Sequence, residues 1–371
     1  MVSLEIVTSY AEFLRMKPLW DELLQQSGNH TVFLTWEWMK AWWDVLRTEE
    51  SLHIVIGRNR QNEVIGIAPF MRKTKRLCGI PVSYIMFISS GNGVLPEYLN
   101  IITREDKKTE FLNALMQHFF NEKKQWDVLR MTDMRSDNGI LGTLKDFSCS
   151  RCSYTAREKG QCIYTELPKT WDEYLKSLSR KSRYNITKKI KEMSKEYKLE
   201  FMVLDNKAGM SEVMRKLHEL HVKRMGDKGM KGTSLTRQFW DFQASVADEF
   251  LKNKWLILGL LKANGNIVAC QYAYAYDNIL FHYQSGIDPT FGKYSVGLIS
   301  NAYMIQEAIR RGLSEYDFLR GQENYKTHWA KRSRACAEII VWNNNERARL
   351  DRFLYCLHSY KAKLARWIGK D

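Results

Sequence analysis

The chain has 371 residues, of which 44% are hydrophobic and 27% are charged, and its formal net charge is +15. This length exceeds what one hydrophobic core usually holds, and this composition excludes disordered and fibrous classes, so two globular domains are expected. No apolar run reaches membrane-spanning length, no secretory signal pattern precedes the first strand, and the seven cysteines form no disulfide framework, which together predict a cytoplasmic protein with reduced thiols.

The first half is predicted to be an α/β unit. Its expected elements are a strand over Leu4–Val7, helices over Tyr10–Gln25 and Trp36–Leu46, strands over Leu52–Gly57, Val64–Met71 and Val82–Ile88, a helix over Lys107–Lys123 and a strand over Trp126–Met131. The last helix has Phe111, Leu115 and Phe119 on one face, which is typical of a helix packed on a sheet.

The second half repeats this order. Its expected elements are strands over Trp255–Leu261, Ile267–Tyr276 and Ile279–Ser285, a helix over Val296–Arg311 and a strand over Glu315–Leu319. The segments 126–130 and 316–320 also have similar residues at the same place in the order. We interpret this as an internal repeat of a strand–strand–strand–helix–strand unit, with two unrelated α/β domains as the alternative. The predicted domains are residues 1–160 and 161–345, followed by a basic amphipathic helix over 346–371.

Between the halves lies a basic segment, Arg180–Lys191, after a short helix whose N-terminus Thr170 is expected to cap. Tyr184 and Asn185 interrupt the run of Lys and Arg. This mixture favours a site for a phosphate-bearing ligand, and a solvated basic face is the alternative. The net charge likewise favours a polyanionic ligand: nucleic acid, anionic lipid or a phosphate-rich small molecule.

The loop Asp288–Gly297 follows a strand and opens a helix. Helix N-termini have free backbone N–H groups and a positive dipole end, which suit a pyrophosphate. Lys293 adds charge and Gly297 permits close approach of the backbone, whereas Ser295 acting only as a helix cap is the structural alternative. The loop is not a P-loop, because G-x-x-x-x-G-K is absent.

The segment Tyr316–Trp329 leaves a buried strand and contains Asp, Arg, Glu, Tyr, Lys and His close together. Ligand sites in open α/β sheets lie at such strand ends. No metal site is expected, because His218 and His221 do not form H-E-x-x-H and the pair Cys149 and Cys152 lacks further ligands at similar spacing. His282 is interpreted as a satisfied core residue.

Several segments carry a resemblance to a known family: Phe33–Trp38 with Ala41–Trp43, Gly66–Phe70, Trp126–Leu129, Leu178–Asn185, Gly286–Pro289 and Asp317–Lys326. In these the chain resembles the BioF2-like (CelD-type) acetyltransferases of the GNAT superfamily, relatives of the FemAB peptidoglycan aminoacyltransferases. The resemblance implies an α/β (α+β) fold of tandem GNAT-like domains, each a mixed twisted sheet flanked by helices, with an acyl-CoA donor and no metal. One departure is the loop Lys293–Gly297, where GNAT enzymes usually have Q/R-x-x-G-x-G/A.

The resemblance implies a role for Lys326, and acyl transfer also needs a base and an acid, for which nearby residues are candidates. Lys326 matches the lysine of an aromatic–Lys pair and is assigned to the oxyanion or the leaving group, with Glu323 and Asp317 as candidate bases and Tyr325 and Tyr283 as candidate acids. The residues expected to bind the donor are Lys293, Tyr294, Ser295, Val296, Gly297 and Tyr283. The residues expected to bind the acceptor are Arg180, Lys181, Arg183, Tyr184, Asn185 and Arg320. Asp317 paired with Arg320 at the strand end is the structural alternative.

The predicted function is transfer of an acyl group, acetyl in the first instance, from acyl-CoA to an amine or hydroxyl of a sugar, polysaccharide precursor or other small acceptor in envelope or polysaccharide biosynthesis. One alternative takes the acyl group from aminoacyl-tRNA, and another is a non-catalytic binding module. The C-terminal helix is expected to dock on the protein's own core, with peripheral contact at the inner face of an anionic membrane as its alternative.

Overall fold

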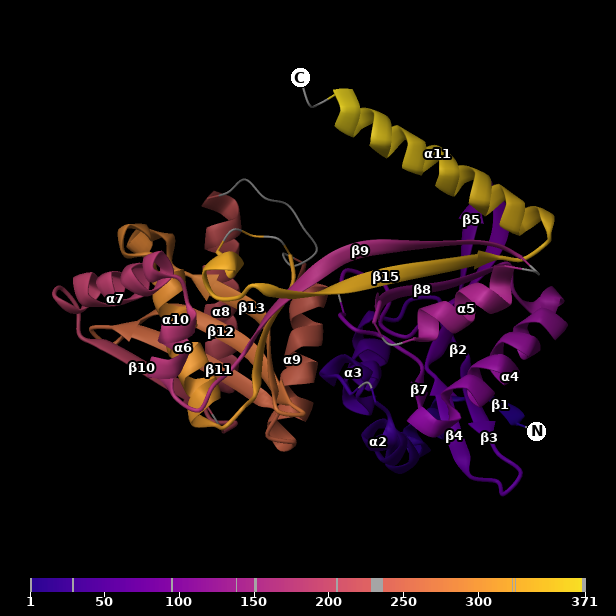
Figure 1. Ribbon diagram of the computed structural model, residues 1–371, viewed down its shortest axis with the longest axis horizontal. Helices are drawn as coiled ribbons and strands as arrows, with labels where there is room; N and C mark the ends of the chain where they lie inside the picture. The colour runs from indigo at the N-terminus through magenta and orange to yellow at the C-terminus, as the bar shows by residue number, and fades with distance from the viewer. Residues whose placement is uncertain are drawn as a thin grey trace.

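The computed structural model describes residues 2–28, 30–94, 96–137, 139–149, 152–204, 206–227, 236–321, 323 and 325–368. The chain forms two α/β halves that lie side by side and share one long sheet (Figure 1). That sheet has 11 strands in the order β10-β11-β12-β13-β14-β9-β15-β8-β6-β5-β2, and a second sheet has the order β1-β3-β4-β7. The predicted fold class, mixed twisted sheets flanked by helices, is confirmed.

The first half follows the predicted order, but three of the expected elements are divided. Its elements are β1 (Ser3–Val7), α1 (Tyr10–Arg15), α2 (Lys17–Gln26), α3 (Trp36–Leu46), β2 (Ser51–Leu52), β3 (Ile54–Arg58), β4 (Val64–Ala68), β5 (Phe70–Leu77), β6 (Ile80–Phe87), β7 (Ile102–Thr103), α4 (Lys108–Asn121), β8 (Val128–Arg135) and α5 (Ile140–Cys149). The expected helix 10–25 is divided at Met16. The expected strand 52–57 is divided at His53, and its two parts enter different sheets. The expected strand 64–71 is divided at Pro69, which has no N–H for a ladder bond, and its two parts enter different sheets.

The second half contains β9 (Ser153–Glu166), α6 (Trp171–Ser177), α7 (Arg180–Ser194), β10 (Leu199–Leu204), α8 (Met210–Asp227), α9 (Arg237–Lys252), β11 (Leu256–Ala263), β12 (Asn266–Tyr276), β13 (Ile279–Ile287), the 3-10 helix η5 (Pro289–Tyr294), α10 (Val296–Arg310), β14 (Glu315–Arg320), η6 (Lys326–His328), β15 (Arg332–Trp342) and α11 (Glu346–Ile368). The predicted cap of α6 is present, because Thr170 Oγ1 accepts a hydrogen bond from the N–H of Glu173 at 3.2 Å.

The predicted repeat is visible in the pairing of the strands. β6 and β8 run parallel, with Tyr84 opposite Val128, and α4 connects them. β13 and β14 also run parallel, with Leu280 opposite Tyr316, and α10 connects them. In each half this parallel pair follows antiparallel strands, so the same strand–strand–strand–helix–strand unit occurs twice.

The strands β9 and β15 join the two halves. β15 pairs with β8 of the first half and with β9, whereas the C-terminal part of β9 pairs with β14. Figure 1 shows both strands crossing from one half to the other. The predicted boundary between residues 160 and 161 therefore falls inside β9, and the division into domains stays a prediction.

Aromatic side chains pack the two halves against each other. The helices α3 and α9 are in contact, and the rings of Trp38 and Phe242 lie 5.0 Å apart, edge to face. Phe33 lies in the short 3-10 helix before α3, and the centroid of its ring is 6.0 Å from that of Tyr283 on β13. The expectation that the tryptophans of 36–43 are core residues is confirmed, because all four are buried.

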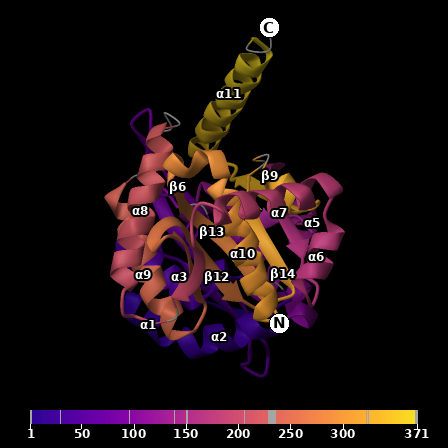
Figure 2. The ribbon, with the colours of Figure 1, turned by 90° about the vertical axis from the view of Figure 1, so that its left-hand side faces the viewer.

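The C-terminal helix α11 departs from its expected position. Its first turns dock on the sheet: Ala348 is buried and Asp351 accepts hydrogen bonds from Tyr84 and from Trp342. Beyond them the helix projects from the body (Figures 1 and 2), and Phe353 and Tyr360 are 64% and 66% exposed. The prediction of docking is thus wrong for this part, because the helix runs past the end of the sheet. Side chains from residue 362 onward, which belong to the predicted amphipathic helix 346–371, lie outside the described residues. No described helix has both the length and the apolarity to span a bilayer.

Candidate active site

A cavity of about 490 Å³ lies at the N-terminus of α10. Residues from α7, α8, β13, η5, the start of α10 and the segment after β14 line it: Ser182, Asn185, Lys189, Arg224, His282, Ser285, Ile287, Asp288, Pro289, Gly292, Ser295, Val296, Gly297, Leu298, Asn301, Tyr325, His328 and Trp329. Its walls combine apolar side chains with a few convergent polar groups, as ligand sites do. The strands β13 and β14 end near it, as the sequence analysis predicted for the loop 288–297.

The N-terminus of α10 has no side-chain cap. Ser295 occupies the N-cap position with φ 56° and ψ 50°, and its side chain makes no capping hydrogen bond. The alternative that Ser295 serves only as a cap is therefore wrong, and the first backbone N–H groups of α10 are left to serve a ligand. A Cβ on Gly297 would lie 2.7 Å from Cδ1 of Ile287, so a side chain at this position would displace the cavity wall.

The charged side chains around the cavity favour an anion. Arg224 of α8 donates to Ser285 Oγ at 3.3 Å, and Lys189 of α7 donates to the carbonyl of Lys293 at 3.0 Å. Asp288 is the one acidic residue among the described residues of the lining. Its carboxylate accepts a hydrogen bond from Lys223 Nζ at 2.7 Å. Burial raises the pKa of Asp288, but the hydrogen bonds from Lys223 and Thr290 outweigh burial and lower it, so this carboxylate is already neutralised by a partner.

His282 of β13 contributes a neutral imidazole to the cavity wall. Its Nδ1 lies 3.0 Å from the hydroxyl of Tyr316. Burial, with smaller contributions from the charges of Lys326 and Arg224, lowers the pKa of His282 to about 3. The interpretation of His282 as a satisfied core residue is right about its burial and its partner, but the residue also faces the cavity.

Tyr325 is the residue of the predicted catalytic set that lines the cavity. Burial and the charge of Glu323 raise its pKa to about 12. The phenol is therefore protonated at neutral pH and can donate a hydrogen bond or a proton, which fits its predicted role as a candidate acid.

Lys326 is placed differently from its predicted role. Its side chain is buried, and Nζ donates to the carbonyls of Arg320 at 2.7 Å and Leu319 at 3.2 Å. Nζ also lies 3.0 Å from Glu323 Oε2, whose side chain is 58% exposed. Neither Lys326 nor Glu323 belongs to the cavity lining, so the lysine holds the end of β14, and both transfer roles stay predictions.

Asp317 and Arg320 lie between the two halves and outside the cavity lining. Asp317 is fully buried and accepts from Tyr98 at 2.6 Å and from the N–H of Leu319 at 2.7 Å, and burial raises its pKa to about 6. The sequence analysis allowed a pair between Arg320 and Asp317, but Arg320 has other partners. It binds Glu97 at 2.6 Å and Asp133 at 2.5 Å, because the folded sheet brings these first-half carboxylates to the end of β14.

Three residues predicted to bind the donor point elsewhere. Lys293 is exposed and pairs with Glu196 at 3.4 Å, and the hydroxyl of Tyr294 also bonds Glu196. Tyr283 follows His282 on β13 and therefore projects from the opposite face of the strand, where it packs on Trp38 and Tyr274. By contrast, Ser295, Val296 and Gly297 line the cavity as predicted.

The basic segment 180–191 contributes through one face of α7. Ser182, Asn185 and Lys189 face the cavity at helical spacing, so Asn185 is the residue of the predicted acceptor set found in the lining. Arg180 and Lys181 are exposed, Arg183 donates to the carbonyl of Lys176 at 3.5 Å, and Tyr184 is exposed. Arg224 is a cavity residue that the sequence analysis missed, because no nearby motif marks its helix.

Comparison with known proteins supports an acyltransferase fold. Residues 180–327 match the family model described as an acetyltransferase (GNAT) domain, a range that contains all the lining residues but His328 and Trp329. A search of curated proteins gives no match.

Among solved structures, FemX aligns at 12% identity over 92% of this chain and 98% of its own, with a TM-score of 0.65. The C-terminal domain (DUF2156) of a putative lysylphosphatidylglycerol synthetase from Agrobacterium fabrum aligns at 10% identity over 92% and 94%, with a TM-score of 0.54. L-PGS from Bacillus licheniformis aligns at 13% identity over 89% and 92%, with a TM-score of 0.53. These likenesses extend over nearly the whole of each chain and show a common fold.

Proposed function

We propose that this chain is a GNAT-type acyltransferase that moves an acyl group, acetyl in the simplest case, from acyl-CoA to an amine or hydroxyl. The observation that carries the proposal is the uncapped N-terminus of α10, which opens into a cavity of about 490 Å³ inside the segment that matches the GNAT domain model. A helix N-terminus of this kind suits the pyrophosphate of coenzyme A.

Lining residues would bind the donor and supply the acid for acyl transfer, whereas the candidate base that would take the acceptor's proton lies outside the lining. The backbone of Val296 and Gly297 would hold the pyrophosphate, and Arg224 would add positive charge. The acceptor attacks the thioester carbonyl, the carbon–sulfur bond breaks, and Tyr325 would give its proton to the leaving thiolate. Glu323 remains the candidate base, since Asp317 is buried and held by hydrogen bonds.

The acceptor we propose is a sugar, polysaccharide precursor or other small molecule, as the resemblance to the BioF2-like (CelD-type) enzymes implies. Asn185 reaches the cavity from α7, and the basic residues Arg180 and Lys181 lie exposed on the same helix. A phosphate-bearing acceptor, such as a nucleotide sugar, would find positive charge beside the cavity.

An aminoacyl-tRNA donor is the second candidate. Two proteins that share the fold are a putative lysylphosphatidylglycerol synthetase and L-PGS, and FemX shares the fold with the highest of the three TM-scores. The net charge of +15 and the exposed face of α7 suit a nucleic acid as well as a phosphate-bearing small molecule.

Thermal shift assays distinguish these candidates. Acetyl-CoA at a hundred times its Kd should stabilise the fold by about 2.7 kcal/mol, whereas acetylated pantetheine, which lacks the pyrophosphate, should give a much smaller shift. Stabilisation by an aminoacylated tRNA alone would favour the second donor. Absence of both shifts would favour a non-catalytic binding module.

The projecting part of α11 supports a peripheral contact with the inner face of an anionic membrane. Phe353, Leu357 and Tyr360 are exposed there, and Arg349, Arg352 and Lys361 are exposed on the same helix. Exposed apolar and basic side chains on one helix suit the boundary between headgroups and acyl chains, and the positive charge opposes pairing with a second copy of the helix.

A further inference from the structure

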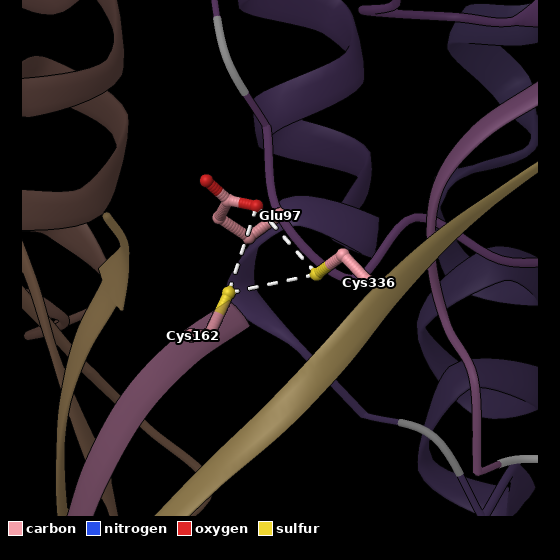
Figure 3. A group of neighbouring side chains, drawn as sticks. All are labelled: Glu97, Cys162 and Cys336. Atoms are coloured by element: carbon pink, nitrogen blue, oxygen red, sulfur yellow. Dashed lines mark hydrogen bonds between the residues drawn. The ribbon is translucent and has the colours of Figure 1, made fainter. Parts of the chain in front are cut away.

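Three side chains from distant parts of the sequence meet in the junction between the halves (Figure 3). Cys162 lies on β9, Cys336 on β15, and Glu97 in the segment between β6 and β7. The two Sγ atoms are 3.5 Å apart, and Glu97 Oε2 lies 3.8 Å from Sγ of Cys162 and 3.9 Å from Sγ of Cys336. All three residues are buried. They line no part of the cavity at α10.

We propose that Glu97, Cys162 and Cys336 form a binding site for a thiophilic divalent cation, with Zn²⁺ as the best fit. A tetrahedral zinc ion has bonds of about 2.3 Å to sulfur and about 2.0–2.2 Å to oxygen, which separates its ligands by roughly 3.5–3.8 Å. The three observed separations are close to these values, so one ion fits all three atoms with little movement of the side chains. Two sulfur ligands select Zn²⁺ over Mg²⁺ or Ca²⁺.

The register of the sheet creates this arrangement. Cys162 of β9 is opposite Arg334 of β15, and Cys336 stands two residues further along β15, opposite Gly160. Residues two apart on a strand share a face, so the two thiols project to the same side of the sheet. Glu97 reaches that side from the first half of the chain.

Arg320 balances the charge of the site. Two thiolates and one carboxylate on a divalent cation have a net charge of −1, and the Arg320 guanidinium lies 2.6 Å from Glu97 Oε2. Asp133 holds the same guanidinium at 2.5 Å, as outer partners orient metal ligands in known sites. Nε of Arg320 is buried and has no acceptor within the described part of the chain, so the guanidinium beside Glu97 keeps one donor for a further partner.

The strand β9 leaves room for this arginine. At Gly160, where φ is 152°, an added Cβ would lie 3.2 Å from Cδ of Arg320. A bound ion would connect Glu97 to Cys162 on β9 and Cys336 on β15. These cysteines lie 65 and 239 positions from Glu97 in the sequence. We therefore place the site at the junction of the halves, independent of the proposed transfer.

Metal titration of the full-length chain tests this site. The protein is reduced, stripped with a chelator and titrated with Co²⁺, whose thiolate charge-transfer and tetrahedral d–d bands report the ligands. We expect one equivalent of Co²⁺ to bind and Zn²⁺ to displace it, since Zn²⁺ is the tighter binder. Cys162→Ser and Cys336→Ser should each weaken binding by roughly a hundredfold or more, and Glu97→Gln by at least about tenfold. Cys270→Ser, which changes another buried cysteine, should bind as the wild type does.

Two further measurements use the wild-type chain and so do not depend on whether the variants fold. Zn²⁺ should raise the Tm of the stripped wild-type chain, and elemental analysis of the protein purified without chelator should find zinc at one equivalent. Wild-type protein that shows neither Co²⁺ bands nor a Zn²⁺-dependent Tm would overturn the proposal. Bands that persist in the Cys162→Ser/Cys336→Ser double variant would also overturn it. So would a Cys162–Cys336 disulfide in the isolated protein together with no metal uptake after reduction.

Discussion

The hydroxyl of Tyr316 lies 3.0 Å from Nδ1 of His282, and His282 lines the cavity at α10. Both residues are buried, and burial lowers the pKa of His282 to about 3. The imidazole is therefore uncharged at neutral pH. An uncharged ring beside the uncapped helix N-terminus can accept or donate a hydrogen bond without adding charge to the site.

The pH dependence of stability follows from that shift. Unfolded His has a pKa of about 6.5, so between pH 3 and 6.5 the unfolded chain binds a proton at this site and the native chain does not. Stability should therefore rise with pH across that window, by at most about 1.4 kcal/mol per pH unit from this residue.

Urea unfolding of wild type and His282→Asn at several pH values isolates this contribution. The difference in unfolding free energy between the two proteins should change with pH below 6.5 and be constant above it. Burial raises the pKa of Asp317, so its contribution has the opposite sign, but it cancels in the comparison. A difference that does not change with pH would show that His282 is charged in the native state.

Arg224 should contribute to donor affinity, because its guanidinium lines the cavity beside the N-terminus of α10. Arg224→Gln should weaken acetyl-CoA binding by roughly tenfold to a hundredfold, the value of one charge-assisted hydrogen bond. The matched control is Arg180→Gln/Lys181→Gln, which removes positive charge from the exposed part of α7. Calorimetry at low and high salt should find the control near wild type. Equal losses in both proteins would indicate that bulk charge, and not the cavity, binds the donor.

Lys326 is expected to affect both stability and turnover. Nζ bonds the carbonyls of Leu319 and Arg320, so Lys326→Ala should lower the free energy of unfolding by about 1–3 kcal/mol. The family resemblance further predicts a loss of turnover of roughly a hundredfold at equal folded fraction. Unfolding curves and single-turnover rates separate the two effects. Normal turnover per folded molecule would reject the catalytic role and leave the structural one.

The α11 helix should bind anionic vesicles. Flotation of the full chain with phosphatidylglycerol vesicles should recover bound protein, and Phe353→Ser/Leu357→Ser/Tyr360→Ser should reduce recovery about tenfold, because burial of apolar area is lost. Truncation at Asn345 is a poorer test, since it also removes the bonds of Asp351. Zwitterionic vesicles are the control. Equal recovery of both proteins from anionic vesicles would reject the membrane contact.

The sequence was sufficient to predict the order of elements within the two repeated units and the position of the loop before α10, whereas β9, α8, α9 and β15 were not predicted. Both predictions rest on local sequence spacing. The apolar periodicity predicts the helix α10, and the loop before the first periodic residue predicts where that helix starts. Ser295, Val296 and Gly297 line the cavity for that reason. Tyr325 follows the adjacent strand, which runs parallel to β13 and so ends on the same side of the sheet.

Long-range partners were not predictable from local pattern. Arg320 binds Glu97, 223 residues away, because β9 and β15 carry the two halves into one sheet. The face of β13 on which Tyr283 lies depends on the register with β12 and β14, and the sequence does not determine that register uniquely. The Glu97–Cys162–Cys336 cluster has no short motif for the same reason, so a search for closely spaced ligands does not find it.

Calorimetry of acetyl-CoA binding to two variants, each with a new glutamate at one helix N-terminus, tests the location of the donor most directly. The α4 N-terminus, the counterpart of the α10 N-terminus in the first half, is approached through the acidic residues Glu105 and Asp106, which suit the helix dipole but repel a phosphate. Gly297→Glu should abolish binding, because the new carboxylate would occupy the cavity and a Cβ there would already meet Ile287. Arg104→Glu, which introduces the same side chain beside α4, should bind as the wild type does, provided that both variants keep the wild-type Tm. Loss of binding in Arg104→Glu with retention in Gly297→Glu would place the donor in the other half and contradict the proposed site.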